Sequence, residues 1–150
     1  MLQQLRCRIP SDRMKVLLVE DEPGVQAYVS AILRGGGYEV EAVADGDEAL
    51  RVYKNRKSDY DLVLTDRSHP GMDGIELAAK IRKINPSQII AFQTAGSTDS
   101  IVEQRIATHA VSDIPRIEKP FDSEQLLRFI KSVTEKILTK TDPDSTHDSQ

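Results

Sequence analysis

The sequence is poor in cysteine and in aromatic residues, and it has no long apolar run. Its 150 residues include one cysteine, Cys7, and no tryptophan, which excludes an internal disulfide. No apolar stretch approaches the roughly 20 residues that span a bilayer. The residues before Met14 lack the apolar segment of a secretory signal peptide. We therefore expect a cytoplasmic protein that makes no contact with a membrane.

An excess of basic residues is also missing. The chain has 20 Lys and Arg residues against 24 Asp and Glu residues, which gives a formal net charge of −4. Proteins that bind nucleic acids normally carry a basic face, so direct nucleic-acid binding is not expected. Apolar residues make up 39% of the chain and charged residues 29%, as in an ordinary globular domain.

The length suits one domain with one sizeable core. The regular apolar pattern begins at Met14, and the last apolar residue is Leu138. We expect an N-terminal extension at residues 1–13, a single domain at 14–138 and a disordered polar tail at 139–150.

Short apolar runs alternate with helical patterns throughout the expected domain. Predicted strands cover residues 15–19, 38–44, 62–65, 89–92 and 116–118. Predicted helices cover residues 23–34, 46–53, 75–84, 98–110 and 123–137. Five strands alternating with five helices predict an α/β fold with a parallel sheet covered on both faces. In such sheets, functional groups gather at the carboxyl ends of the strands.

Polar side chains follow four of the predicted strands. In chain order they are Glu20 and Asp21, Asp66, Thr94 and Lys119. Because clustered carboxylates repel one another, they favour a cation such as Mg²⁺, which takes oxygen ligands. An amine and a hydroxyl suit the oxygens of a phosphoryl group. The set predicts a phosphoryl-transfer site in which Asp66 is the nucleophile and forms an aspartyl phosphate.

Four segments carry a resemblance to a known family. They are VLLVEDE at 16–22, DLVLTDRSHPGMDG at 61–74, TAG at 94–96 and IEKPF at 117–121. In this order and approximate spacing, they resemble the receiver domains of two-component response regulators. The resemblance implies a flavodoxin-like (βα)5 three-layer sandwich with strand order 2-1-3-4-5.

The resemblance also implies a role for each matching residue. Asp66 matches the phosphoacceptor, and Asp21 matches the acid that binds Mg²⁺ directly. Glu20 matches the acid that acts on the metal through water, and the backbone carbonyl of Ser68 matches a further metal ligand. Asp66 itself would also contact the metal.

Two further residues match groups that bind the phosphoryl oxygens. Thr94 matches the hydroxyl that turns toward the phosphoryl group, and Lys119 matches the amine that contacts it. The family pattern makes the Lys119–Pro120 peptide cis, an isomer accessible to X-Pro bonds.

The function implied is that of a signalling domain and not of a turnover enzyme. A sensor histidine kinase or a histidine phosphotransfer protein would donate the phosphoryl group, and the domain would assist its own phosphorylation and autodephosphorylation. The surface of the fourth helix, fifth strand and fifth helix would then switch and bind an unidentified downstream protein, or a second copy in a phosphorylation-linked homodimer.

The sequence departs from the family pattern at several positions. Arg116 stands where the family usually has an aromatic residue that reports phosphorylation. The connection at residues 109–115 is longer than expected. Ser68 and Gly96, at the two variable positions that flank the phosphoryl group, are both small, so we expect them to leave water access open. His69 replaces the usual apolar residue and is interpreted as a loop residue.

Other functions stay open or are disfavoured. Arg116 keeps open a pseudo-receiver that is not phosphorylated and serves as a protein-interaction or dimerisation module. Phosphatases with an aspartate nucleophile carry a second Asp two residues later, where this chain has Ser68. A nucleotide-binding or flavin-binding domain is disfavoured because the first loop, EDEPG, is not a Gly-rich phosphate loop.

Overall fold

Five parallel strands and five helices make up the fold. The computed structural model describes residues 13–56, 59–67, 72–95 and 100–141. The strands are β1 (Lys15–Val19), β2 (Glu39–Val43), β3 (Leu62–Asp66), β4 (Ile90–Ala95) and β5 (Arg116–Lys119). The helices are α2 (Pro23–Gly35), α3 (Gly46–Arg56), α4 (Gly74–Ile84), α5 (Ser100–Thr108) and α6 (Ser123–Thr141). The sheet order is β2-β1-β3-β4-β5, which confirms the predicted flavodoxin-like fold.

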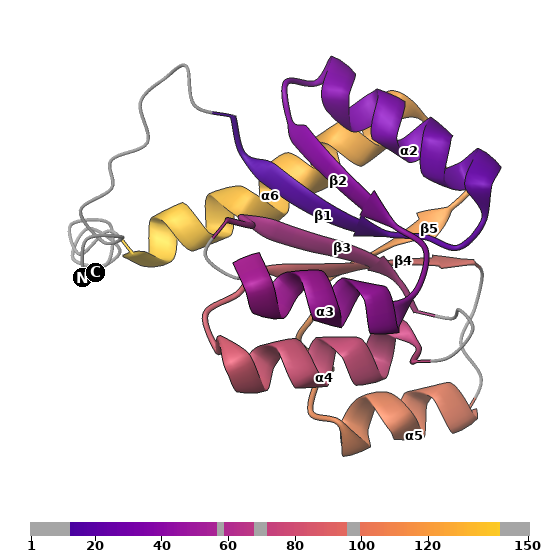
Figure 1. Ribbon diagram of the computed structural model, residues 1–150, viewed down its shortest axis with the longest axis vertical. Coiled ribbons are helices and arrows are strands. Elements are labelled where there is room, and N and C mark those ends of the chain that lie inside the picture. The colour runs from indigo at the N-terminus through magenta and orange to yellow at the C-terminus, as the bar shows by residue number, and fades with distance from the viewer. Residues whose placement is uncertain (1–12, 57–58, 68–71, 96–99, 142–150) are drawn as a thin grey trace.

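The helices form two layers, one on each face of the sheet (Figure 1). Helices α2 and α6 cover one face, and α3, α4 and α5 cover the other. Each layer buries its own apolar cluster against the strands. The first includes Val29, Leu33, Leu126 and Ile130, and the second includes Tyr53, Leu77, Ile81 and Phe92. The predicted three-layer sandwich is therefore confirmed.

The central strands explain the continuous apolar runs in the sequence. All five residues of β3 are buried, and so are the last four of β1, because helices cover both of their faces. The strand register then places the carboxyl ends along one edge of the sheet, with Asp66 paired to Gln93 and Ala95 paired to Lys119. This edge is where the predicted functional side chains meet.

Local sequence features start and stop the helices. Glu22 caps α2 by accepting a hydrogen bond from the Val25 amide, and Pro23 follows at the first helical position. After α2, Gly37 has a φ of 96°, a left-handed conformation that favours glycine. At α6, Asp122 and Gln125 exchange two hydrogen bonds of 2.8 Å and form a capping box.

Several boundaries differ from the sequence-based expectation. Helix α3 continues to Arg56 instead of Tyr53, and α6 continues to Thr141, past Leu138. Strand β4 begins at Ile90, one residue later than expected, and extends to Ala95. Polar residues in these segments weaken the apolar pattern without breaking the backbone hydrogen bonding, so pattern alone ends the elements too early.

The long connection between α5 and β5 packs against the domain. Val111 and Ile114 are buried in the same cluster as α4. Asp113 accepts two hydrogen bonds from Arg82 of α4, of 2.8 and 2.7 Å, and Arg82 also contacts the carbonyl of Ala110. This connection thus joins α4 to the approach to β5.

Candidate functional site at the carboxyl edge of the sheet

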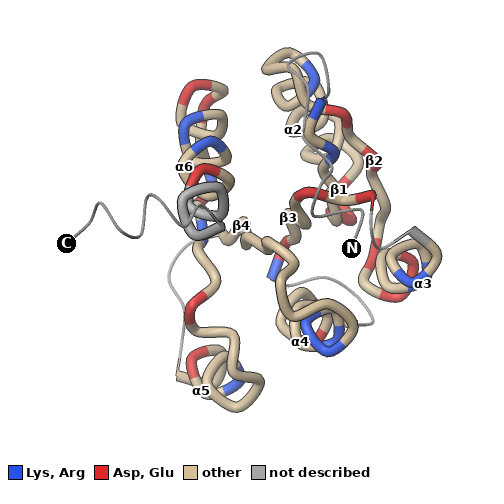
Figure 2. Tube along the Cα trace, turned by 90° about the vertical axis from the view of Figure 1, so that its left-hand side faces the viewer, with Lys and Arg blue, Asp and Glu red and all other residues tan. Residues whose placement is uncertain are grey.

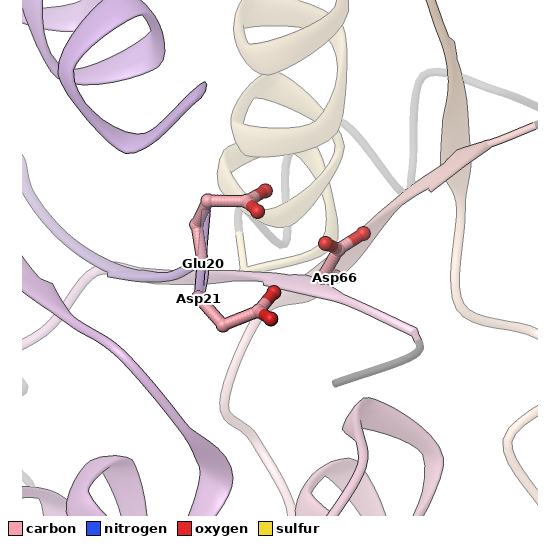
Figure 3. Close-up of side chains that lie close together, drawn as sticks. All are labelled: Glu20, Asp21 and Asp66. Atoms are coloured by element: carbon pink, nitrogen blue, oxygen red, sulfur yellow. The ribbon is translucent and has the colours of Figure 1, made fainter. Parts of the chain in front are cut away.

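Three acids converge after β1 and at the end of β3 (Figure 3). One ligand oxygen each from Glu20, Asp21 and Asp66 lies within 4.8 Å of the others. Glu20 is 1% exposed and Asp66 is 8% exposed, whereas Asp21 is exposed to solvent. The cluster therefore has a buried side and a side that is open to an incoming ligand.

Lys119 contributes a positive charge to this cluster from the end of β5. Its Nζ lies 3.1 Å from Glu20 Oε1 and 3.3 Å from both Asp66 Oδ1 and Oδ2. The Lys119–Pro120 peptide is cis, as the resemblance implies. One ammonium group is thus shared by two buried carboxylates.

Glu20 is held by further hydrogen bonds. Gln93 Nε2 donates to Glu20 Oε1 at 2.9 Å, and the Glu22 amide donates to Oε2 at 3.1 Å. The backbone carbonyl of Glu20 accepts a hydrogen bond from Gln26 Nε2 at 2.9 Å. Because both carboxylate oxygens have protein donors, Glu20 has a fixed orientation behind the more accessible Asp21.

The electrostatics of the cluster favour an added cation. Burial, and next the negative charge of Glu20, raise the pKa of Asp66 to about 7, although Lys119 opposes this rise. Burial lowers the pKa of Lys119, but the charges and hydrogen bonds of Asp66 and Glu20 outweigh burial and raise it overall. A single ammonium therefore does not fully neutralise the carboxylates.

Buried polar atoms without partners gather at the same edge. Among the described residues, Arg67 Nη1, Gln93 Oε1 and Thr94 Oγ1 are buried side-chain atoms with no hydrogen-bond partner. Each such atom costs on the order of 1–3 kcal/mol of folding free energy. All three residues lie at or just beyond the paired ends of β3 and β4. An incompletely satisfied edge of this kind is typical of a ligand site.

Arg67 directly follows Asp66 and is 9% exposed. Burial, followed by the like charge of Arg116, lowers the pKa of its guanidinium, while Glu103 and Glu118 oppose this effect. Arg116 itself is exposed on β5. A buried cation close to the phosphoacceptor candidate is therefore repelled by Arg116.

Helix α4 begins directly against the end of β3. A Cβ atom on Gly74 would lie 2.0 Å from the backbone oxygen of Asp66, so the close approach requires glycine. The Gly74 amide donates a 3.1 Å hydrogen bond to the carbonyl of Arg67, and Asp73 caps the helix by accepting from the Glu76 amide. These contacts fix the backbone on both sides of the turn after Asp66.

The structure brings four of the predicted site residues into one cluster, namely Glu20, Asp21, Asp66 and Lys119. Thr94 lies on β4, beside the residue that pairs with Asp66. Ser68, His69 and Gly96 lie outside the described residues.

Sequence reasoning missed Arg67 and Gln93. Arg67 directly follows β3, and Gln93 follows three apolar residues of β4. A polar side chain inside a buried strand is the signal that could have drawn attention to Gln93.

The donor set fits a hard divalent cation. The three acids offer oxygen ligands on neighbouring strand ends, and one of them, Asp21, is accessible from solvent. Mg²⁺ binds through one or two carboxylates while keeping several water molecules. The raised pKa of Asp66 shows that further positive charge would stabilise its ionised form.

The comparison with protein families identifies the domain. The family model of the response regulator receiver domain matches residues 16–131. The chain belongs to this family. The match includes the acids of the cluster, Thr94 and Lys119. The chain is therefore a receiver domain of two-component signalling.

The curated relatives of this receiver differ in length. This chain is 33% identical over 119 residues to transcriptional regulatory protein HprR of Escherichia coli (strain K12), and the match covers 79% of this chain and 51% of HprR. It is 30% identical over 118 residues to sporulation initiation phosphotransferase F of Bacillus subtilis (strain 168), covering 78% of this chain and 90% of that protein. The chain thus spans about half of HprR and most of phosphotransferase F.

Solved structures agree with the receiver fold. A response regulator receiver domain protein (CheY-like) from Methanospirillum hungatei JF-1 superposes with a TM-score of 0.75 at 26% identity, covering 86% of this receiver and 99% of that chain. In the part of this receiver that the structure describes, no helix combines the length and apolar character needed to cross a bilayer.

Proposed function

We propose that Asp66 is the phosphoacceptor of this receiver and takes a phosphoryl group from a phosphohistidine. The observation that carries the proposal is the position of Lys119 Nζ, 3.3 Å from both carboxylate oxygens of Asp66, beside two further acids. Asp66 is buried at the end of a central strand, which holds its carboxylate in a defined place. A fixed nucleophile with an adjacent cation suits in-line phosphoryl transfer.

In the transfer step, an oxygen of Asp66 forms a bond to phosphorus as the phosphorus–nitrogen bond of the donor histidine breaks. The nitrogen keeps the electron pair of that bond and takes up a proton from solvent. Lys119 stabilises negative charge on the phosphoryl oxygens. Asp66 acts in its ionised form, which the positive charge of Lys119 favours.

Mg²⁺ is the proposed cofactor. Asp21 and Asp66 would hold it directly, Glu20 would act through water, and the Ser68 carbonyl would be a further ligand. Bound in this cluster, the ion would neutralise carboxylate and phosphoryl charge. The fixed orientation of Glu20 supports an indirect role, because its two oxygens already accept hydrogen bonds from protein donors.

The proposed output is a change in the surface of α5, β5 and α6. Thr94 Oγ1 is buried and lacks a partner among the described residues, so a new acceptor at Asp66 would attract it. Such a shift biases the receiver between two states. Arg116 occupies β5 on this surface, so the shift proceeds without the rotation of an aromatic side chain.

A sensor histidine kinase or a histidine phosphotransfer protein is the proposed donor. In support, the sensor kinase CckA of Brucella abortus (strain 2308) contains a segment 33% identical over 121 residues, covering 81% of this receiver and 12% of CckA. The receiver would assist its own phosphorylation and dephosphorylation without turning over a separate substrate. Its output would be binding to another protein or to a second copy of itself, in the cytoplasm and without direct contact to nucleic acid.

The test is phosphorylation by acetyl phosphate in the presence of Mg²⁺, followed by intact mass. The wild type should gain one phosphoryl adduct, and chelation of Mg²⁺ should prevent it. Asp66→Asn should lose the adduct, whereas Asp59→Asn, at an exposed aspartate before β3, should retain it. An adduct that persists in Asp66→Asn would refute the assignment of the phosphoacceptor.

The competing function is an unphosphorylated interaction module, which the exposed Arg116 on β5 favours. It would be supported if Mg²⁺ binds to the wild type, as measured by calorimetry, but neither acetyl phosphate nor a phosphohistidine donor produces an adduct. A partner captured equally with and without the phosphodonor would also support the unphosphorylated interaction module.

A further inference from the structure

Gln93 is a fully buried amide inside the site. It lies on β4 with 0% exposure and pairs in register with Asp66. Its Nε2 donates to Glu20 Oε1 at 2.9 Å. A carboxylate accepts hydrogen bonds and cannot donate them when ionised, which fixes the amide with its nitrogen toward Glu20.

The same oxygen of Glu20 also accepts from Lys119. Lys119 Nζ lies 3.1 Å from Glu20 Oε1 and 3.3 Å from each oxygen of Asp66. Glu20 and Asp66 therefore compete for one ammonium group. Glu20 has the shorter contact and is the more deeply buried of the two acids.

We propose that Gln93 is a positioning residue that keeps Lys119 available to the phosphoryl group on Asp66. By donating to Glu20 Oε1, the neutral amide partly satisfies the oxygen that would otherwise hold the ammonium more tightly. The free-energy cost of breaking the contact between Lys119 and Glu20 is then smaller when phosphoryl oxygens bind at Asp66. This inference rests on the proposed role of Asp66 as phosphoacceptor.

A purely structural role for Gln93 would be to satisfy the hydrogen-bonding capacity of the buried Glu20 carboxylate. Two observations favour the positioning role in addition to this one. Ala91 and Phe92, the preceding residues of β4, are apolar, as expected where packing alone selects the side chain. Gln93 Oε1 is buried and has no donor among the described residues, so the amide leaves an acceptor unsatisfied in the site while it holds Glu20.

The main test replaces Gln93 by Met, which is similar in shape and cannot donate to Glu20. Phosphorylation by acetyl phosphate at saturating Mg²⁺ should slow about tenfold, while the Mg²⁺ dissociation constant should stay within about twofold, because Asp21 and Asp66 remain. Gln88→Met is the matched control. Gln88 is also buried and hydrogen-bonded, but it precedes β4 at the amino ends of the strands, away from the site. The phosphorylation rate of the Gln88→Met variant should therefore equal that of the wild type.

A second measurement needs neither Mg²⁺ nor phosphorylation. Lys119 is 22% exposed, so its acylation by acetic anhydride can be followed by peptide mass and compared with that of the exposed Lys80. In Gln93→Met the tighter hold by Glu20 should slow modification of Lys119 about threefold relative to Lys80. An unchanged ratio in the folded variant would overturn the inference.

A double variant shows whether Gln93 acts through Glu20. In the Glu20→Gln background, Gln93→Met should change the phosphorylation rate less than about twofold, because the competing carboxylate is gone. Equal effects of Gln93→Met in both backgrounds, or an unchanged rate in the single variant, would refute the inference and leave the proposed phosphoacceptor intact. A wild type that takes up no phosphoryl group would instead refute the proposed function and this inference together.

Discussion

Helices α6 and α5 lie on opposite faces of one sheet and are held to it in different ways. Helix α6 buries Leu126, Ile130 and Val133 and begins with a complete capping box. Helix α5 buries Ile106 but leaves Ile101 67% exposed. Helix α5 carries one acidic and one basic residue (Figure 2). The basic residue, Arg105, pairs with Asp73, the cap of α4.

The difference extends to the strands beneath these helices. The layer of α2 and α6 packs on apolar side chains of β1 and β3. The carboxyl edge near α5 instead contains buried acids, the buried Arg67 and polar atoms that lack a partner within the described part of the chain. Substitutions in the first region should reduce stability, whereas some substitutions at the second should increase it. This separation is expected where a site needs groups that folding alone would not select.

The largest expected effect is at Ile130 of α6, which is fully buried. Ile130→Ala should reduce the free energy of unfolding by about 2–5 kcal/mol, because the lost apolar contacts leave a cavity. Urea unfolding measures this loss. Ile101→Ala on α5 is the matched variant and should change stability by less than about 0.5 kcal/mol. Similar losses in the two variants would contradict the comparison.

Asp66→Asn should raise the free energy of unfolding when Mg²⁺ is chelated, whereas Ile130→Ala should lower it. Folding raises the pKa of Asp66 from 3.8 to about 7, so the folded receiver binds the proton more tightly than the unfolded chain. Wild-type stability should therefore fall as pH rises through this range. The asparagine variant does not titrate there and should be more stable by about 1–3 kcal/mol at pH 8.

The pH dependence of that gain is the sharper measurement. In thermal or urea unfolding, the stability difference between Asp66→Asn and the wild type should shrink toward pH 4, because the carboxyl becomes protonated in the folded receiver as the pH falls toward its unfolded pKa of 3.8. Asp59→Asn, at an exposed position, should show no such trend. A gain that is constant from pH 4 to pH 8 would show that protonation of Asp66 is not its cause.

Arg67→Met should raise stability by about 1 kcal/mol. The substitution removes a buried guanidinium whose Nη1 has no partner among the described residues and which Arg116 repels. Arg51→Met is the control, because Arg51 is 66% exposed on α3 and should have little effect. A clear loss of stability in Arg67→Met, measured by thermal unfolding, would mean that the guanidinium stabilises the fold.

The smallest expected effect is at the ion pair that joins α5 to α4. Arg105→Ala should lose about 0.5 kcal/mol at low salt, and the loss should largely disappear at about 1 M salt through screening. Amide hydrogen exchange in α5 should become faster. Arg128→Ala removes a more exposed pair with Glu124 inside α6 and should leave exchange in α5 unchanged. A salt-independent loss would assign the role of Arg105 to packing.

Much of the fold could be predicted because its local signals agree with its topology. The apolar runs of β1 and β3, the Gly35–Gly37 helix stop and the Asp122–Gln125 cap each act over a few residues. Parallel pairing then follows from the alternation of strands and helices. The approach of Glu20, Asp66 and Lys119 was predictable too, because the carboxyl ends of parallel strands share one edge.

The remaining features depend on contacts between distant residues. The hydrogen bond from Gln93 to Glu20 joins β4 to the end of β1, and neither local pattern reveals it. The packing of the connection at 109–115 depends on Arg82 of α4. The burial of Arg67 depends on the sheet and on the charges of β5 and α5 around it. Local periodicity carries no information about such pairs.

The contact between Gly74 and Asp66 has a mechanical consequence. Because a single added carbon would lie 2.0 Å from the Asp66 carbonyl oxygen, the start of α4 already touches the end of β3 with no side chain between them. The end of β3 therefore has no room to move toward α4, and the first residues of α4 block displacement in that direction. We expect any backbone displacement that begins at Asp66 to be directed toward β4 and α5, so steric contact sets the direction in which the receiver can respond.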